Sequence, residues 1–469
     1  MKKIFLSAIL ALVLLASGLG ARPARAAVTW TVNSLNDPGN GYCDLVECTL
    51  REAIAVAGPT DTINFNVTGA IYLDSQLVIG IPLNIVGPGA SNLIVSGAFV
   101  TRVFSVNSPN VPVNISGITI ADGYITGAPV NDGAGIYNLG ILNLDKVLLD
   151  YNTSSGTSGG GAIYNGSKAT LTITNSAFTE NFSPTRGGAI ANYGSANVSN
   201  SAFYGNIADN GSGGGIFNLG YLTVNNSTFS ENASTTNGSG IYNGIATLTL
   251  KNSIIANGTG VDCYNAATIK PPVVAGNLIE TNAAGQNACG TPAVTGDPML
   301  ASLDYYGGST PTLGLLAGSP ALDSAHDLSC AAFDQRGVSR PQGPHCDIGA
   351  FEALAPPTVT VEQAAGQPDP TNVSPIHFTV TFSQEVTGFA NNDVVLGGSA
   401  GATTAVVNGT GTTYDVVVSG MTGNGTVIAS VNADAAFNAD GLGNLASTSV
   451  DNIVTYEVLT YPSVQSSVR

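Results

Sequence analysis

Basic residues are scarce in this chain of 469 residues, which has 14 lysines and arginines against 31 aspartates and glutamates. Four of the basic residues lie in the first 25 positions, so the rest of the chain carries ten bases against 31 acids and a net charge near −21. Proteins that bind nucleic acid present basic stripes to its phosphates. The composition therefore argues against a nucleic-acid partner and suits calcium or a neutral surface better.

Long apolar runs are absent beyond the N-terminus. The chain begins with MKK, and an apolar segment over residues 4–19 leads to ARA at positions 24–26, the small-x-small pattern of a signal peptidase site. The segment is short for a membrane span of about 20 residues. We therefore interpret residues 1–26 as a removable export signal, and we predict a secreted or cell-surface protein without a transmembrane segment.

Histidine is also rare, with three in the chain, all far from any cluster of metal ligands, and no CxxC spacing occurs. A zinc site is therefore not expected. The six cysteines instead fall into three near-neighbour pairs, and in an exported chain this even count predicts local disulfides. The expected pairs are Cys43 with Cys48, Cys263 with Cys289, and Cys330 with Cys346.

A glycine-rich phrase returns at a nearly constant interval along the chain. It reads GAGIYN, GGGAIYN, GGAIAN, GGGIFN and GSGIYN, and its isoleucines are spaced 27, 27, 26 and 25 residues apart. Between the copies lies a second phrase, such as LTITNSAFTEN, in which apolar and polar residues alternate with the period of a strand. A period this steady predicts a solenoid.

Each repeat is too thin to bury its own apolar face, so successive copies must stack. Parallel strands laid beside their equivalents give a parallel β-helix, which we expect to run from about Asp61 to about Ala288. The glycines turn the corners between strands, where the left-handed region is required. Stacking predicts an inward aromatic column of Phe178, Phe203 and Phe229, and an amide ladder of Asn181, Asn206 and Asn232.

The first coil of such a stack needs a cover for its apolar end and strand edges. The stretch CTLREAIAVA predicts a helix in which Thr49 and Glu52 form a capping box. Leu50, Ile54 and Ala57 then share one face of that helix. We expect it to lie over the first coil.

Several of these motifs resemble known families. DLVECTLREAI is similar to the N-terminal motif of CSLREA-type exported proteins, and residues 297–325 with DQRGVSRPQGPHCDIGAFE resemble the choice-of-anchor Q region. The coils are similar to polymorphic outer-membrane-protein repeats. The resemblance implies a right-handed, pectin lyase-like parallel β-helix at the cell surface or secreted, from families whose members mostly lack an assigned activity.

The composition changes again at ALAPPTVTVE, whose proline pair is typical of a linker. Beyond it, short alternating strands and an expected hairpin turn at Asn408-Gly409 predict an Ig-like β-sandwich, which resembles bacterial Ig-like repeats. Asp434, Asp440 and Asn444 could hold calcium through oxygen ligands, or they could simply shape a turn.

The expected organisation follows from these boundaries. It comprises a signal peptide (1–26), an N-terminal cap (27–60), β-helix coils (61–290), a choice-of-anchor Q-like C-terminal part of the β-helix (291–354), an Ig-like sandwich (355–458) and a tail (459–469).

Two glutamates are the candidates for catalysis. Glu180 and Glu231 occupy the same slot two coils apart, so their backbones should lie about 9.5 Å apart, close to the carboxylate separation of inverting glycosidases. The slot is expected to be a solvent-side turn, however, and we expect Tyr151 and Ala256 to occupy it in other coils.

Three tyrosines that recur beside the glycine corner, Tyr137, Tyr164 and Tyr242, could stack on sugars or could pack inward. The leading hypothesis is a non-catalytic protein for adhesion or glycan binding, with an extracellular polysaccharide or another cell surface as partner and no cofactor other than possible calcium. The rival hypotheses are a polysaccharide lyase or glycoside hydrolase of the pectin lyase-like fold and a structural spacer without a ligand.

Overall fold

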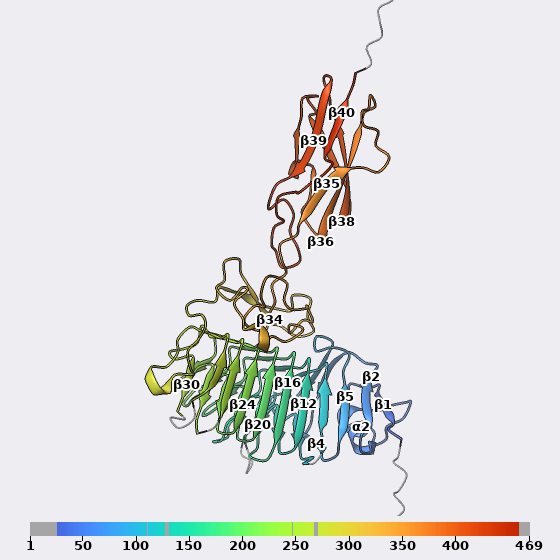
Figure 1. The fold of residues 1–469 in the computed structure, drawn as a ribbon. Coiled ribbons are helices and arrows are strands. Elements are labelled where there is room, and N and C mark those ends of the chain that lie inside the picture. Colours follow the sequence, from blue (N-terminus) through green and yellow to red (C-terminus); the bar gives the residue numbers. More distant parts are fainter. Residues whose placement is uncertain (1–25, 110, 127–130, 246, 267–270, 459–469) are drawn as a thin grey trace, which may run out of the picture.

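The computed structural model describes residues 26–109, 111–126, 131–245, 247–266 and 271–458. Nearly all of the expected export signal and the whole expected tail lie outside these residues. Within them, residues 29–279 form the parallel β-helix that the repeats predict, as Figure 1 shows.

Four parallel sheets, here named A to D, run along the stack. Sheet A consists of β1 (Thr29–Val32), β2 (Thr62–Phe65), β5 (Leu83–Val86), β8 (Val113–Ser116), β12 (Ile141–Asp145), β16 (Thr170–Thr174), β20 (Ser195–Ser199), β24 (Tyr221–Asn225), β28 (Leu248–Lys251) and β31 (Val273–Ala275). Sheet B consists of β3 (Gly69–Tyr72), β6 (Leu93–Ser96), β9 (Thr119–Ala121), β13 (Leu148–Asp150), β17 (Ala177–Thr179), β21 (Ala202–Tyr204), β25 (Thr228–Ser230), β29 (Ile254–Ala256) and β32 (Leu278–Ile279). Sheet C consists of β4 (Leu77–Ile79), β7 (Phe104–Val106), β11 (Ile136–Asn138), β15 (Ile163–Asn165), β19 (Ile190–Asn192), β23 (Ile216–Asn218), β27 (Ile241–Asn243) and β30 (Cys263–Asn265), and the shorter sheet D consists of β10 (Tyr124–Ile125), β14 (Thr153–Ser154), β18 (Phe182–Ser183), β22 (Ile207–Ala208) and β26 (Ala233–Ser234).

The repeat spacing gives the register of the stack. The isoleucines of the glycine-rich phrase pair directly from coil to coil in sheet C. The predicted aromatic column is confirmed, because the fully buried rings of Phe178, Phe203 and Phe229 stack with centroids 4.5 and 4.3 Å apart. Burial of such large apolar side chains is the main favourable term that holds the coils together.

The predicted amide ladder is confirmed as well. Asn152 begins it, and each side-chain amide donates to the oxygen of the next, at 3.0, 2.9 and 2.9 Å through Asn181, Asn206 and Asn232. A second buried ladder, which we did not predict, closes the glycine-rich phrase in sheet C. It joins Asn138, Asn165, Asn192, Asn218, Asn243 and Asn265.

Glycine recurs because each coil passes the same corner in the left-handed region. The φ angles of Gly160, Gly187 and Gly213 are 76°, 59° and 72°. A Cβ at Gly187 would lie 2.2 Å from the carbonyl oxygen of Ile190, so a side chain there is excluded by space as well as by conformation.

The first coil is covered as expected by helix α2 (Leu50–Val56). Thr49 and Glu52 form the predicted capping box, in which the Thr49 side chain accepts from the Glu52 amide and the Glu52 carboxylate accepts from the Thr49 amide at 2.9 Å. Arg51 pairs with Asp37 and donates to the carbonyls of Ser75 and Gln76, so it fastens the cap to the coils.

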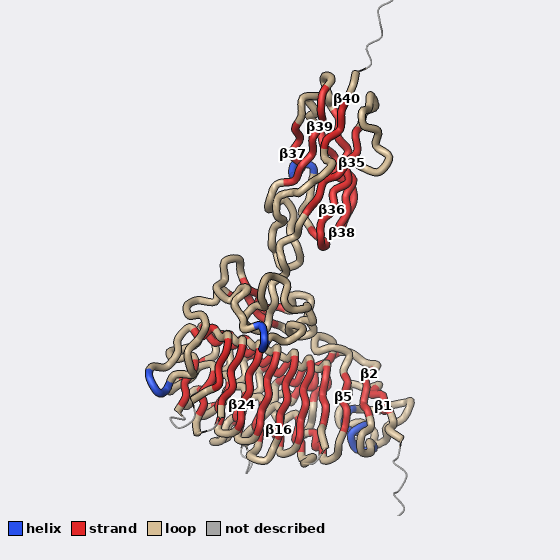
Figure 2. Tube along the Cα trace, in the orientation of Figure 1, coloured by secondary structure: helices blue, strands red, loops and turns tan. Residues whose placement is uncertain are grey.

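Residues 291–354 do not extend the stack as we expected. Their strands β33 (Leu300–Asp304) and β34 (Thr312–Leu315) pair only with each other, while short helices η2 (Gly285–Asn287) and η3 (Asp327–Ser329) precede and interrupt the segment. The segment folds back over the side of the coils, and we name it the lid. In Figure 2 it is mostly loop and lies between the β-helix and the C-terminal domain.

The C-terminal domain is a sandwich of two antiparallel three-stranded sheets, β35-β36-β38 and β37-β39-β40. The expected hairpin turn at Asn408-Gly409 is wrong, because both residues lie inside the long strand β38, where Gly409 has a φ of 121°. The elements are β35 (Val359–Gln363), β36 (Ile376–Val386), η4 (Asn391–Asp393), β37 (Val394–Gly397), β38 (Thr404–Ser419), β39 (Gly425–Val431) and β40 (Ile453–Tyr456).

All three predicted disulfides are present, and the described residues contain no free cysteine. One braces the N-terminal cap, one joins β30 to the segment after it, and one closes a loop of the lid. They link Cys43 with Cys48, Cys263 with Cys289, and Cys330 with Cys346.

Candidate functional site: a groove beside an aromatic row

The sheet C strands direct one residue per coil outward. In β11, for example, Ile136 and Asn138 are buried while Tyr137 between them is half-buried, as the alternation of a strand requires. The question that the sequence left open is therefore answered: Tyr137, Tyr164 and Tyr242 pack on the outer face. With three further rings they form what we name the aromatic row: Tyr137, Tyr164, Tyr193, Phe217, Tyr242 and Tyr264.

The aromatic row is stacked at its two ends and interrupted in the middle. Tyr137 and Tyr164 stack at 5.0 Å, and Phe217 and Tyr242 at 5.1 Å with an interplanar angle of 1°. Stacked rings cover each other's faces and leave only their edges to a ligand. Between the two stacks the register position is Ala191, which is fully buried and carries no ring to continue the stacking.

The ring of a neighbouring residue, Tyr193, lies between the two stacks. Tyr193 donates from its hydroxyl to the carbonyl of Ser158 at 2.9 Å, which draws its ring toward the preceding coil. Its centroid is 6.3 Å from that of Phe217, and the planes are tilted by 52°. A groove of about 460 Å3, which we name the sheet C groove, lies beside the second stack and is lined by Thr157, Thr185, Arg186, Asn210, Gly211, Ser212, Phe217, Leu219 and Tyr242.

Backbone hydrogen bonds between coils hold the walls of the sheet C groove. The loops that lead from sheet D to sheet C stack on one another: Gly160 N donates to Arg186 O at 2.8 Å, and Asn210 N donates to Pro184 O at 3.1 Å. Arg186 itself pairs with Ser212 in an isolated parallel bridge. The lining groups thus occupy fixed positions on a rigid scaffold.

Arg186 is the charged group of the sheet C groove. Its guanidinium carbon lies 5.1 Å from the centre of the Phe217 ring, and the side chain is exposed. Arg102 makes the corresponding contact with Tyr137 at 5.0 Å, but it is buried and donates to Asp132 O, Gly133 O and Gln76 Oε1. Burial lowers the pKa of Arg102, whose role is structural.

The ionisation of the aromatic row follows from its packing. Burial, together with the neighbouring Tyr137, Tyr193 and Asp132, raises the pKa of Tyr164 to about 12. Burial also raises the pKa of Tyr242, although the positive charge of Arg186 opposes this shift. The hydroxyls therefore stay neutral at physiological pH and can donate hydrogen bonds.

The candidate catalytic glutamates lie on a different face, at the corner after sheet B. Glu180 and Glu231 have φ angles of 51° and 57°, as a tight corner demands. Tyr204 donates to Glu231 Oε2 at 2.9 Å, and burial with this hydrogen bond raises the pKa of Tyr204 to about 12. Burial, then Asp150 and Glu231, raises the pKa of Glu180. The corner role explains both residues.

The structure places Tyr151 in this slot as expected, but the expectation for Ala256 is wrong. Ala256 pairs with Ser230 in sheet B, so the residue in the glutamate slot of that coil is Asn257, with a φ of 56°. Glu231 and Asn257 border a wider acidic groove of about 750 Å3, together with Glu280 and Asp297. No basic side chain lines it among the residues that the structure describes.

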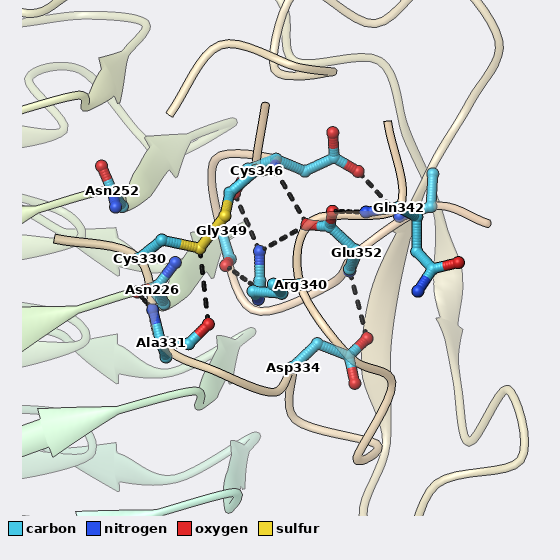
Figure 3. Close-up of polar contacts among 12 residues, drawn as sticks. Asn226, Asn252, Cys330, Ala331, Asp334, Arg340, Gln342, Cys346, Gly349 and Glu352 are labelled. Atoms are coloured by element: carbon cyan, nitrogen blue, oxygen red, sulfur yellow. Dashed lines mark hydrogen bonds and ion pairs between the residues drawn. A yellow bond between two sulfur atoms is a disulfide. The ribbon is translucent and has the colours of Figure 1, made fainter. Parts of the chain in front are cut away.

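The DQRG…CDIGAFE motif builds a buried charge network in the lid, as Figure 3 shows. Arg340 and Glu352 are almost fully buried and pair at 2.9 Å. Arg340 also donates to the carbonyls of Asp347 and Gly349, while the Glu352 carboxylate accepts from the amides of Gln342 and Asp347. Burial and then Glu352 raise the pKa of Asp347 to about 7. This motif is a structural centre of the lid.

Two of the three calcium candidates, Asp440 and Asn444, have other contacts. Asp440 accepts from Arg336 at 3.0 Å and from the Leu354 amide at 2.9 Å, which joins the sandwich to the lid. Asn444 bonds to backbone groups of its own loop. Within the described ranges, no group of three or more His, Cys, Asp or Glu is arranged to hold a metal ion. Calcium binding stays a prediction.

Sequence reasoning missed Arg186 and the polar groups around it. Two signals were present: Arg186 is the only arginine between residues 131 and 260, and Ala191 replaces the aromatic residue of the repeat in a single coil.

Comparison with protein families, curated proteins and solved structures finds no match in any of the three. In the part of the chain that the structure describes, no helix combines the length and apolar character that crossing a bilayer requires.

Proposed function

We propose that this protein is a non-catalytic, secreted or cell-surface protein that binds glycans in the sheet C groove. The observation that supports the proposal is the sheet C groove itself, a concave site that combines two aromatic rings with neutral hydrogen-bonding groups. The partner is an extracellular polysaccharide or the glycans of another cell surface.

The chemistry of the groove suits a sugar. Phe217 and Tyr242 give it an apolar aromatic wall, and Thr157, Thr185 and Ser212 surround this wall with hydroxyl groups. Carbohydrates combine apolar C–H faces with a rim of hydroxyls, so they match a site with one aromatic side and several neutral hydrogen-bonding groups. A site held by inter-coil backbone bonds also loses little conformational entropy when a ligand binds.

The test removes one aromatic ring of the groove wall, Tyr242. We expect Tyr242→Ala to weaken glycan binding by roughly twofold to tenfold, because an aromatic contact contributes about 0.5 to 1.5 kcal/mol. The measurement is a glycan array on the wild-type protein, followed by calorimetric titration of the best ligand into both proteins.

Tyr221→Ala is the matched control. Tyr221 lies in β24 of the same coil as Phe217, is exposed and belongs to sheet A rather than to the groove. Binding should be unchanged in this variant. Equal losses in both variants, or an array without any bound glycan, would contradict the proposal.

A polysaccharide lyase or glycoside hydrolase is the second candidate function, and the observation that favours it is the raised pKa of Glu180, which burial, Asp150 and Glu231 cause. Incubation of the array ligands with the protein, followed by analysis for shortened or unsaturated products, tests this possibility. Turnover that is lost in Glu180→Gln but kept in Tyr242→Ala would establish the enzyme and reject the non-catalytic proposal.

A further inference from the structure

The sheet C groove differs in charge from the molecule around it. The chain has 31 acidic residues against 14 basic ones, yet none of the nine residues that line the groove is acidic and one of them, Arg186, is a cation. Across a surface of this composition, a groove with a net positive charge is a local exception.

The charge of Arg186 is not neutralised by the protein. Within the described residues, its side chain forms no ion pair or hydrogen bond, and its recorded contact is with the ring of Phe217. The carboxylate beside the groove, Asp209, instead accepts from the side-chain amide of Asn210 at 3.1 Å. Arg102, by contrast, occupies the equivalent place over Tyr137 with its donors directed to protein oxygens.

An exposed arginine without an ion-pair partner preferentially binds anionic groups with two oxygens in a plane. The guanidinium has five N–H donors in a planar fork that matches two oxygens of a carboxylate or a sulfate ester. The position of Arg186 is fixed by backbone bonds to the neighbouring coils, and its contact with Phe217 holds the fork against the aromatic wall. A sugar ring packed against the edges of Phe217 and Tyr242 would bring an acidic substituent within reach of it.

We infer that the sheet C groove selects anionic glycans, and that Arg186 binds the carboxylate or sulfate group of the sugar. This inference rests on the proposed function, and it names the class of glycan that the proposed function leaves open. Thr157, Thr185 and Ser212 then bind the neutral hydroxyls of the same ligand.

The experiment compares matched oligosaccharides by calorimetric titration. The probes are an oligogalacturonide, its methyl ester, a sulfated galactan oligosaccharide and the same galactan without sulfate. We expect one of the two anionic probes to bind at least about tenfold more tightly than its uncharged counterpart, the effect expected for a charge-assisted hydrogen bond. Which anionic probe binds identifies the group as carboxylate or sulfate.

Two variants test the role of Arg186. Arg186→Gln should reduce binding of the anionic probe by about tenfold and leave the uncharged probe unaffected. Arg186→Lys keeps the charge and loses the planar fork, so it should bind with intermediate affinity. Lys168→Gln is the matched control, because Lys168 is an exposed cation outside the groove and its loss changes the net charge equally.

The outcomes distinguish glycan binding in general from the selection of anionic glycans. If uncharged probes bind as tightly as anionic ones, or if Lys168→Gln weakens binding as much as Arg186→Gln, the inference is wrong while glycan binding stands. If no probe binds and the glycan array is also empty, both are wrong. Equal thermal unfolding midpoints for wild type and variants ensure that a loss of binding does not come from a loss of fold.

Discussion

At the scale of single residues, the lid has a buried acid with an unusual ionisation. Asp347 is 3% exposed, and burial together with Glu352 raises its pKa to about 7, from an ordinary value of 3.8. A group whose pKa is higher in the folded state binds more protons there than in the unfolded chain. Its contribution to stability is therefore complete below about pH 4 and is lost as the pH rises to about 7.

We therefore expect Asp347→Asn to change the pH dependence of stability. Between pH 4 and 7, the unfolding midpoint of the wild type should decline relative to that of the variant, because only the wild type must ionise this buried carboxyl group. The measurement is thermal unfolding at unit steps of pH. Asp304→Asn, which alters an exposed acid in the lid, should keep the wild-type profile, and an unchanged profile in Asp347→Asn would contradict the assignment.

Individual side-chain contacts are also what the sequence could not predict. The sequence shows the motif that contains Arg340, Asp347 and Glu352, but it does not show that these side chains contact one another. Those contacts form within an irregular loop that has no periodicity. The sheet C groove was missed for a related reason. Its one charged group, Arg186, occurs in a single copy of the repeat, so the features that the repeats share do not indicate it.

At the scale of the elements, the amide ladders join each coil to the next. Asn206 is fully buried, accepts from the side chain of Asn181 at 2.9 Å and donates to Asn232 and to the carbonyl of Phe178, each at 2.9 Å. Both ladders also saturate polar groups that a chain of tight corners would otherwise leave unpaired inside the stack.

Asn206→Ala should therefore destabilise the coils strongly. The substitution leaves the Asn181 backbone N–H without its acceptor and removes the side-chain donor to the Phe178 carbonyl, and each buried unpaired group costs about 1 to 3 kcal/mol. We expect the free energy of unfolding to fall by about 3 kcal/mol, measured by urea denaturation. Asn210→Ala, at an exposed asparagine of the next loop, should have little effect, and similar losses in both variants would argue against the ladder as a source of stability.

Periodicity explains which elements the sequence predicted well. Residues that recur every 25 to 27 positions must lie above one another, so the Phe178 column, one amide ladder and the glycine corners followed directly. Periodicity gives no prediction beyond the last repeat. The lid was expected to continue the coils, and Asn408-Gly409 was taken for a hairpin turn although β38 bends through it without interruption.

At the scale of the whole molecule, one arginine connects the lid to the sandwich. Arg336 is nearly buried, pairs with Asp334 at 2.9 Å and with Asp440 of the sandwich at 3.0 Å, and donates to Glu352 O at 2.6 Å. In Figure 1 the sandwich projects from the side of the β-helix, above the lid. The pair between Arg336 and Asp440 lies at this junction.

We expect Asp440→Ala to loosen the sandwich from the lid. Loss of this carboxylate removes the contacts to Arg336 and to the Leu354 amide, so the linker before β35 becomes the main connection. Small-angle X-ray scattering should then show a broader distribution of intramolecular distances. Asp434→Ala, in the same loop but without a contact to the lid, should leave the distribution unchanged; a similar response in both variants would point instead to a shared role such as calcium binding.

The way the lid docks has a consequence for the size of the molecule. It bonds in turn to the equivalent corner asparagines of successive coils: Thr310 to the Asn175 carbonyl, Phe333 to Asn200, Ala331 to Asn226, and His326 to Asn252. Sheets alone would tolerate the loss or gain of one whole winding, since every strand would find an equivalent neighbour. A lid whose successive segments each bond to one particular corner would not tolerate such a change. It thereby fixes the number of windings between Asn175 and Asn252.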